Sequence, residues 1–501
     1  MYRPSSAVRP LSPALGQSIA RTAGGTLALP SAGVRPHRAP SPSVWKTLRV
    51  PTTGFIFFLL AHVVIAMAME RFRFVATAHA LVCWLGGIAC AFAGMRRERI
   101  VMIAGYIAAS EVLWRAAEAQ VFYEGGKYAI AAIFLASMLR LRLYRLRWPA
   151  IIYFLLLLPS IAMTIGMVTP SVARGLISFN LSGPLAFTLS VLYLSQVRVK
   201  PTQLLRILSI MIGPLVGLAF VCSSATFGAE QIEFTTESNF QTSGGAGPNQ
   251  VSSVLGWGIV CSFLWLAFQR RSLLSTALGL GVMLLCAIQA ALTFSRSGIW
   301  MSGICILVAL CFLARDPRTV AKMVLLSGIV ALIGWVVIVP ALEEFTGGKL
   351  SERYAKKGFS NRETIAQQDL LLFAENPILG IGPGMGKYWR GKEFGAGGAA
   401  HTEFTRLFSE HGLFGVAALF TILGMSLRRL LVAGTAQEKA LRGTAVIYSF
   451  AFMAVTAMRV ALPGFVFGLA FITLALPENR SAYAINRHRR GISANKLAQC
   501  L

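Results

Sequence analysis

Residues 273–298 read LLSTALGLGVMLLCAIQAALTFSRSG, an apolar run that ends in a short polar stretch around Arg296. The 19 residues at positions 273–291 contain no charged side chain. A helix of that length rises about 29 Å, at ~1.5 Å per residue, which matches a hydrocarbon core of about 30 Å. This stretch is predicted to be a membrane-spanning helix that places Arg296 at one membrane surface.

Apolar runs of similar length recur along the chain. Hydrophobic residues make up 55% of the sequence and charged residues 13%, and the mean hydropathy is +0.64, which excludes a soluble globular domain. The predicted spans are 54–69, 74–94, 99–113, 127–143, 149–168, 178–197, 205–227, 251–268, 273–291, 297–314, 320–341, 413–431, 443–458 and 463–476. We predict an all-α, polytopic membrane helical bundle of about 12–14 transmembrane helices with a long, partly helical outer loop.

The loops between these spans indicate which side faces the cytoplasm. Lys and Arg near helix ends are retained inside, and every second loop is basic: 96–99, 140–147, 198–206, 270–271, 315–322 and 428–442. Both termini are therefore predicted to be cytoplasmic, and the two long loops, 228–250 and 342–402, fall outside. The net charge of +27 reflects this topology rather than nucleic-acid binding, because the basic residues are dispersed.

The chain divides into five parts on this reading: a basic cytoplasmic tail (1–50), eleven spans (51–341), a large outer loop with the candidate catalytic residues (342–412), three spans (413–478) and a second basic tail (479–501). The first tail lacks acidic residues and a continuous apolar core, so it is not a secretory signal. A flexible tail touching anionic lipid is favoured over an organellar transit peptide, because no amphipathic period is evident.

The outer loop carries Arg362 and His401, on the same predicted face as Arg296. Residues 360–363, Ser-Asn-Arg-Glu, are typical of a capping box, and an amphipathic helix follows that stops before Pro377. Arg362 then lies in the first helical turn, where the helix dipole favours an anion. A solvated loop arginine is the alternative for Arg362, and snorkelling to the headgroups is the alternative for Arg296.

The acidic residues narrow the chemistry. The chain has two aspartates, Asp316 and Asp369, so the neighbouring aspartates that commonly hold a metal in nucleotide-sugar transferases are missing. We expect neither a metal ion nor an organic cofactor, and a diphosphate would be bound by arginine instead. Residues 380–387, GIGPGMGK, do not form a phosphate loop, because they follow a helix and lack Ser or Thr after the lysine. His401 is predicted to begin a helical stretch, residues 401–411, that ends at Gly412 and leads into the next membrane helix. A neutral His401 could take a proton from a sugar hydroxyl, whereas a capping or solvated histidine is the alternative.

Charged residues also gather at the outer ends of the third and fourth predicted spans. Glu111, Arg115, Glu118, Glu124 and Lys127 lie there. Ionisable residues at that depth are costly unless they are paired or used. They are interpreted either as mutual ion pairs or as the lining of an acceptor entrance.

Taken in order, several of these motifs resemble the O-antigen ligase and polymerase superfamily. They are Ser-Arg-Ser-Gly at 295–298, Arg362 at the head of a loop helix, Asn-Pro at 376–377 followed by Gly-Ile-Gly at 380–382, and His401 followed by Glu-His-Gly-Leu-Phe-Gly at 410–415. The resemblance is best between about residues 255 and 423. Gly-Pro-Asn-Gln at 247–250, residues 111–115 and Gly-Lys-Tyr at 126–128 also fit it.

The resemblance implies a metal-independent, inverting glycosyltransferase in the bacterial inner membrane that acts on an undecaprenyl-diphosphate-linked glycan at the periplasmic face. In that family paired arginines hold the diphosphate and a loop histidine assists the acceptor hydroxyl, and these roles carry over to Arg296, Arg362 and His401. The candidate substrate-binding residues are Arg115, Glu111, Lys127, Asn249, Glu403 and Arg406. Thr402 follows the histidine where asparagine is frequent, which bears on the substrate more than on the reaction.

The acceptor stays open at this level: lipid A core for a ligase, a second lipid-linked repeat for a polymerase, or a protein hydroxyl. The expected partners are the lipid-linked oligosaccharide, one of these acceptors and membrane lipids, without nucleic acid. A lipid-linked glycan flippase is the rival class. Transporters often place charged sites at the membrane midplane within an internal repeat, whereas the ionisable residues here lie mostly at outer helix ends. A structural scaffold would leave the arginine and histidine grouping unexplained.

Overall fold

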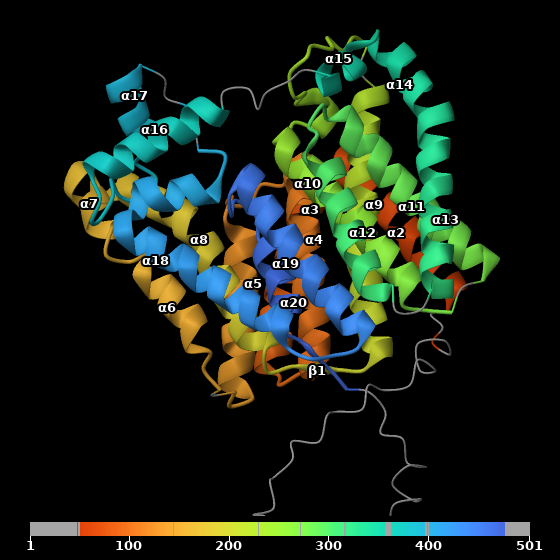
Figure 1. The fold of residues 1–501 in the computed structure, drawn as a ribbon, viewed down its shortest axis with the longest axis horizontal. Coiled ribbons are helices and arrows are strands. Elements are labelled where there is room, and N and C mark those ends of the chain that lie inside the picture. Colours follow the sequence, from red (N-terminus) through yellow and green to blue (C-terminus); the bar gives the residue numbers. More distant parts are fainter. Residues whose placement is uncertain are drawn as a thin grey trace, which may run out of the picture. The chain divides into compact units, whose positions relative to one another are not determined.

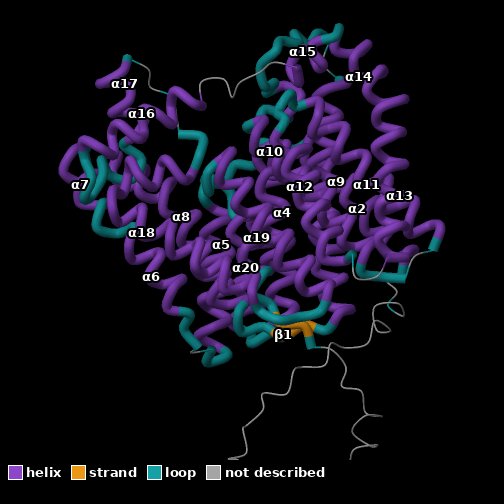
Figure 2. The backbone as a smooth tube through the Cα atoms, in the orientation of Figure 1, coloured by secondary structure: helices purple, strands orange, loops and turns teal. Residues whose placement is uncertain are grey.

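The computed structural model describes residue 48 and residues 51–475, apart from residues 144, 229, 271, 315–316, 356–361, 396–397 and 399. The two tails and Ser360 of the predicted capping box lie outside the described residues. The described chain is almost entirely helical (Figure 1), and its two strands, β1 (Arg198–Val199) and β2 (Thr473–Leu474), pair in parallel (Figure 2). The prediction of an all-α membrane helical bundle is confirmed.

The first half of the described chain forms α2 (Thr52–Arg71), α3 (Arg73–Phe92), α4 (Arg97–Ala116), α5 (Gly125–Arg140), α6 (Trp148–Leu156), α7 (Ile161–Met167), α8 (Pro170–Leu194) and α9 (Pro201–Phe227). The second half forms η1 (Gln241–Ser243), α10 (Pro248–Ala267), α11 (Leu273–Leu292), α12 (Ser297–Leu313), α13 (Pro317–Ile333), η2 (Gly334–Ile338), α14 (Val339–Thr346), α15 (Lys349–Ala355), α16 (Arg362–Glu375), α17 (Gly386–Phe394), α18 (Glu403–Leu431), α19 (Ala436–Thr456) and α20 (Leu462–Leu469).

Nine candidate membrane spans within the described residues are long and apolar enough to cross a bilayer. Two of them join separate helices, Trp148–Met167 across α6 and α7, and Met323–Thr346 from α13 to α14. Other predicted spans coincide with helices that are shorter or more polar. α4 carries charged residues at both ends, α5 has 16 residues and α12 has 17. The last predicted span holds α20, an eight-residue helix that is buried throughout.

The helices differ in how much of their surface is buried, as expected for a membrane protein. α9 and α10 form the centre of the bundle, because 83% and 94% of their apolar windows are buried. By contrast, α2, α3 and the α6–α7 span are only 28% buried and expose large apolar side chains such as Phe57, Val82 and Leu155. A lipid-facing helix needs no polar outer face, so these exposed residues are consistent with membrane contact.

The outer loop and the strand pair lie at opposite ends of the bundle. Figure 1 shows α14, α15, α16 and α17 at one end and β1 at the other. We call the end with α14–α17 the outer face and the end with β1 the inner face, following the predicted topology. α16 begins at Arg362 and ends at Glu375, before Pro377, so the predicted loop helix is present.

A kink in α18 anchors the glycine-rich turn that follows α16. Gly412 adopts φ 58° and ψ −141° inside α18, which interrupts the helical hydrogen-bond ladder. The carbonyl oxygens of Ser409 and Glu410 accept hydrogen bonds from the backbone N–H groups of Ile381 and Gly382, at 2.9 and 3.0 Å. Backbone groups released by the kink are thereby satisfied. The helix end predicted at Gly412 is present as this kink, where two helical segments of α18 meet.

Replacing Gly380 by alanine is expected to lower the free energy of unfolding by about 1–3 kcal/mol. Gly380 has φ 68°, and a Cβ there would lie 2.5 Å from the backbone carbonyl carbon of Glu410. Gly395→Ala is the matched control, since Gly395 has φ 67° and a Cβ added there would meet nothing within 4 Å. Thermal unfolding in detergent measures both variants. Equal losses would show that the close approach to α18 contributes nothing.

Candidate functional site

Arg296 is the residue immediately before α12, at the outer face. It is half-buried, and the polar residues beside it hold the start of this helix against α10. The Ser295 hydroxyl donates to the Asn249 side-chain oxygen at 2.7 Å. A Cβ at Gly298 would lie 1.9 Å from the Ser252 carbonyl oxygen. Gly298 is therefore required for the close helix crossing that fixes Arg296, and Asn249 acts here as a bridge between the two helices.

A second arginine, Arg353 on α15, lies next to this motif. Its Nε donates to the Phe294 carbonyl oxygen at 3.0 Å, and its Nη1 donates to the Thr236 carbonyl oxygen at 2.8 Å. Phe294 presents that oxygen from a left-handed backbone conformation, φ 56°. These bonds tie α15 to the start of α12. Sequence reasoning did not identify Arg353, because no motif surrounds it.

Arg362 joins the same charged neighbourhood. Burial lowers the pKa of Arg362 from its ordinary value, and the positive charges of Arg353 and Arg296 lower it further. Three guanidinium groups from α15, α16 and the start of α12 thus interact electrostatically at the outer face. Like charges held together in a partly buried position favour a polyanionic ligand. The structure brings Arg296 and Arg362 together as the sequence predicted.

His401 lies beside this group, in the segment that leads into α18. Burial is the main cause that lowers the pKa of His401 to about 4, and the charges of Arg362, Arg459 and Arg390 act in the same direction. The imidazole is therefore neutral near pH 7 and able to accept a proton. The prediction that His401 begins a helix was wrong by two residues, since α18 begins at Glu403. Thr402 is the N-cap, and its hydroxyl accepts from the Phe404 N–H at 3.1 Å.

Arg459 approaches His401 from the connection between α19 and α20. Its Nη2 donates to the Ala400 carbonyl oxygen, one residue before His401. Burial lowers its pKa. We use the name cationic cluster for the four arginines Arg296, Arg353, Arg362 and Arg459, which lie near the neutral His401. Arg459 was also missed from the sequence, because it lies in a short connection without a recognisable motif.

The loop helices are fastened to α18 by a buried ion pair. Arg390 of α17 pairs with Asp369 of α16, and their side chains are 1% and 0% exposed. Asp369 also accepts from the Thr405 hydroxyl at 2.8 Å and from the Ser409 hydroxyl at 3.3 Å. Arg390 donates to the Gly398 carbonyl oxygen at 2.8 and 3.0 Å. This pair holds the segment before His401 in place.

Replacing Asp369 by asparagine is expected to lower the free energy of unfolding by about 3 kcal/mol, because Arg390 would keep a buried charge without its partner. Denaturant unfolding in detergent measures the loss. The double variant Asp369→Asn/Arg390→Met is the control, and it should recover part of the stability, since neither charge remains. If the double variant loses as much free energy of unfolding as Asp369→Asn and Arg390→Met together, the two residues do not act as a coupled pair.

Glu403 and Arg406 belong to a buried hydrogen-bond network at the start of α18. Arg406 donates to Glu403 at 2.5 and 3.1 Å, to Glu410 at 2.8 Å and to the Asn180 side-chain oxygen at 3.0 Å. Glu403 in turn accepts from the Met458 N–H at 3.1 Å. These partners satisfy Arg406 and fix the residues around Arg459. Both side chains also line a cavity of about 190 Å³, together with Phe179, Lys387, Arg390 and Arg459.

Two of the five charged residues predicted at the outer ends of α4 and α5, Glu111 and Arg115, line a second pocket, whereas Glu118 pairs with Arg73. Arg115 pairs with Glu111, donates to the Gln250 side-chain oxygen at 2.8 Å, and lies 3.7 Å from the Tyr123 ring centre. Arg115 also donates to the Arg459 carbonyl oxygen at 3.2 Å. The pocket has a volume of about 340 Å³ and is lined by Trp84, Glu111, Trp114, Arg115, Phe122, Tyr123 and Gln250, among others. Ion pairing and a pocket lining are thus both present.

Lys127 lies on α5 near this pocket and is fully buried. Its ammonium nitrogen is 5.6 Å from the Tyr123 ring centre and 5.5 Å from that of Phe179. Within the described part of the chain, the nitrogen has no hydrogen-bond partner. A buried ammonium without such a partner is costly, and aromatic faces compensate for only part of that cost.

The fold and this arrangement define a class: a polytopic membrane protein with a cationic cluster and a neutral histidine at one end of its helical bundle. Residues 280–420 match the family model described as O-antigen ligase. This segment contains Arg296, Arg362 and His401, so the resemblance to the O-antigen ligase and polymerase superfamily is confirmed. The match indicates ligase- or polymerase-type activity on a lipid-linked glycan and an acceptor, in polysaccharide biosynthesis. No curated protein matches the chain.

Proposed function

We propose that this protein is an inverting glycosyltransferase of the O-antigen ligase type. It transfers a glycan from undecaprenyl diphosphate to an acceptor hydroxyl at the periplasmic face of the bacterial inner membrane. The observation that carries the proposal is the cationic cluster, in which the charges of Arg362 and Arg459 help to lower the pKa of the neighbouring, neutral His401. A diphosphate is the kind of multiply charged group that several arginines bind together.

In the proposed reaction, Arg296 and Arg362 hold the donor diphosphate. His401 takes the proton of the acceptor hydroxyl while that oxygen attacks the anomeric carbon. The bond between the anomeric carbon and the diphosphate oxygen breaks, and its electron pair leaves with the lipid diphosphate. The arginines stabilise the charge that grows on this leaving group. A single displacement inverts the anomeric configuration.

The carboxylates near the site are engaged by other side chains, which supports a reaction that needs no metal ion. Of the two aspartates in the sequence, Asp369 is engaged with Arg390, Thr405 and Ser409. Glu403 is likewise engaged with Arg406. Guanidinium groups replace a divalent cation in this proposal, because they carry a fixed charge and donate two hydrogen bonds to phosphate.

We place the acceptor in the pocket formed by the outer ends of α4 and α5. Aromatic rings and hydrogen-bonding groups alternate in its lining, a combination suited to the apolar faces and hydroxyls of a sugar. Arg115 connects this pocket to the Arg459 backbone, and Arg459 interacts with His401. Lys127, buried beside the pocket, adds positive charge that attracts a phosphate or carboxylate of the glycan. Asn249, Glu403 and Arg406 then orient the groups that touch substrate.

The test is transfer by the purified protein in detergent, with a synthetic undecaprenyl-diphosphate oligosaccharide as donor and EDTA present. The proposal expects product with a lipid A core, a second lipid-linked repeat or a protein acceptor. Failure with all three acceptors, combined with movement of the lipid-linked glycan across liposomes, would overturn it in favour of a flippase. In cells, accumulation of long lipid-linked chains upon gene loss identifies a ligase, whereas single repeats identify a polymerase.

The pH dependence of transfer is expected to show an acidic limb set by His401. The base must be neutral, so kcat/KM should stay level from pH 7 to about pH 5 and fall as the pH drops through about 4. Bound diphosphate raises the pKa of His401 by its negative charge, so the limb in kcat should lie at a higher pH. A pH–rate series measures both limbs. A kcat/KM limb near pH 6.5 would contradict the lowered pKa.

A further inference from the structure

A large basic pocket lies on the inner face, opposite the cationic cluster. It has a volume of about 1110 Å³ and is bounded by the start of α4, the end of α5, the segment leading to α6, the end of α8 and β1. Six of its lining residues are arginines: Arg96, Arg97, Arg142, Arg145, Arg147 and Arg198. Among the described residues that line it, Glu98 is the one carboxylate. The pocket thus carries a strong excess of positive charge.

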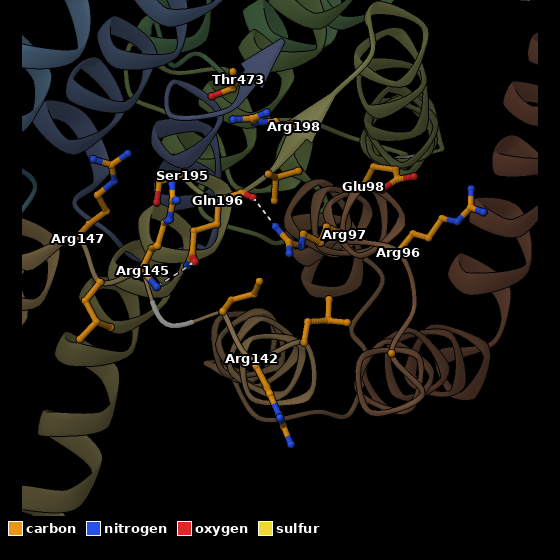
Figure 3. Close-up of a pocket in the computed structure, with 15 residues that line it drawn as sticks. Arg96, Arg97, Glu98, Arg142, Arg145, Arg147, Ser195, Gln196, Arg198 and Thr473 are labelled. Atoms are coloured by element: carbon orange, nitrogen blue, oxygen red, sulfur yellow. Dashed lines mark hydrogen bonds between the residues drawn. The ribbon is translucent and has the colours of Figure 1, made fainter. Parts of the chain in front are cut away.

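Gln196 contacts two of the segments that carry these arginines. Arg97 Nη1 donates to the Gln196 carbonyl oxygen at 2.9 Å, and the Arg145 backbone N–H donates to the Gln196 side-chain oxygen at 3.3 Å. Figure 3 shows Arg97, Arg145 and Arg198 gathered around Gln196. Glu98 is engaged with the Gln203 side chain at 3.1 Å. Within the described chain, none of the six arginines forms an ion pair with a carboxylate, so the pocket is suited to an external anion.

The rim of the pocket continues onto a lipid-facing surface. Leu146 lines the pocket and is 47% exposed, and Trp148 at the start of α6 is 62% exposed. Farther along α6, Ile152 and Leu155 are also exposed. A tryptophan at the end of an apolar span is typical of the membrane interface. The arginines therefore lie at the depth of phospholipid headgroups, with an apolar track beside them.

We propose that this pocket binds the phosphate groups of an anionic phospholipid, with the acyl chains running along α6. Basic pockets between transmembrane helices on the cytoplasmic side bind the headgroups of lipids that carry two separate phosphates, such as cardiolipin. The pocket is large enough for two phosphates and has enough arginines to bind both. The exposed apolar face of α6 favours a lipid over a soluble phosphate compound, because only a lipid has acyl chains to contact it. This site is independent of the proposed transferase reaction, because it lies at the other end of the bundle.

Native mass spectrometry of the purified protein in detergent tests the proposal, with cardiolipin, phosphatidylcholine and inorganic diphosphate as separate probes. The pocket variant is Arg145→Gln/Arg147→Gln/Arg198→Gln, whose wild-type side chains make no hydrogen bond to the described residues. The control variant is Arg99→Gln/Arg206→Gln/Arg428→Gln, which removes the same charge from exposed inner-face arginines outside the pocket. Thermal unfolding without lipid verifies that both variants fold.

The proposal expects cardiolipin to bind more tightly than phosphatidylcholine, and the pocket variant to weaken cardiolipin binding tenfold or more, at roughly a few-fold per arginine. The control variant should keep binding within about threefold. Equal weakening in both variants would overturn the proposal, since only the general surface charge would then attract lipid. Inorganic diphosphate that binds as tightly as cardiolipin would also overturn it and assign the pocket to a soluble ligand. A pocket variant that unfolds early is replaced by the three single variants Arg145→Gln, Arg147→Gln and Arg198→Gln. Each should weaken cardiolipin binding a few-fold, and three single variants that bind as tightly as wild type would overturn the proposal.

Discussion

Replacing Arg362 by alanine is expected to lower glycan transfer about 10²- to 10³-fold. Arg362 begins α16 within the cationic cluster, where its guanidinium would meet charge that develops on the departing diphosphate. An interaction of this kind is stronger in the transition state than in the bound donor, so its loss should affect kcat more than KM. Single-turnover transfer by the purified variant measures the effect, and membrane yield shows whether the protein still inserts.

Two further variants separate charge from geometry at this position. Arg362→Lys keeps the charge but loses the planar pair of donors, so it should recover only part of the rate. Lys349→Ala removes a cation from α15 in the same loop. Lys349 is exposed and paired with Glu352 at 2.8 Å, so transfer should be unchanged. Equal losses in Lys349→Ala and Arg362→Ala would indicate a general effect of loop charge and contradict a specific diphosphate contact.

Arg296 provides an internal check on this role. If both arginines hold the same diphosphate, the double variant Arg296→Ala/Arg362→Ala should lose less than the product of the two single losses. Losses that multiply fully would place the two residues in separate interactions. The two guanidinium groups are close enough for the positive charge of Arg296 to lower the pKa of Arg362.

Much of the fold followed from local patterns in the sequence. Uncharged runs such as residues 273–291 predict membrane helices directly, because a helix of that length crosses the bilayer and satisfies its backbone hydrogen bonds within the segment. The helix from Arg362 to Glu375 was predictable from a polar start and from Pro377 at its end. Arg296 and His401 were predicted on one face from topology alone. These features depend on residues close together in the chain or on the alternation of loops across the membrane.

Other features depend on contacts that no local pattern records. β1, in the first half of the chain, pairs with β2 near the end of the described residues, and each strand has only two residues. Arg353 reaches the start of α12 because Phe294 adopts a left-handed backbone conformation. Arg459 reaches the segment before His401 through the connection between α19 and α20. Tertiary packing determines all three, so their residues show no signal by spacing or composition.

The helix boundary at Gly412 was only partly predictable from the sequence. Glycine after a helical stretch is a common termination signal, and the sequence pattern indicated an end there. In the structure, the chain resumes helical geometry after the kink because Pro377 and the glycine turn at 380–382 complete the broken hydrogen bonds. The signal for a break was correct, whereas its consequence depended on a segment about 30 residues earlier in the sequence.

His401→Ala is expected to lower kcat for transfer about 10²- to 10⁴-fold, the usual contribution of a positioned general base. The imidazole is half-buried and neutral near pH 7, with a pKa of about 4 in the free protein. Binding of the diphosphate would raise that pKa and so increase the basicity of the imidazole when the acceptor must lose its proton. The rate of product formation at saturating donor and acceptor measures the loss.

The affinity for donor distinguishes this role from that of the arginines. His401→Ala should leave the Kd of the lipid-linked donor within a few-fold of wild type, because removing a neutral side chain leaves the arginines of the cluster in place. The variant should also lose the acidic limb of kcat, and His401→Gln should behave alike, since an amide does not act as a base at these pH values. A His401→Ala enzyme that loses donor binding in proportion to kcat would assign the imidazole to donor positioning, and the proton of the acceptor would then need another base.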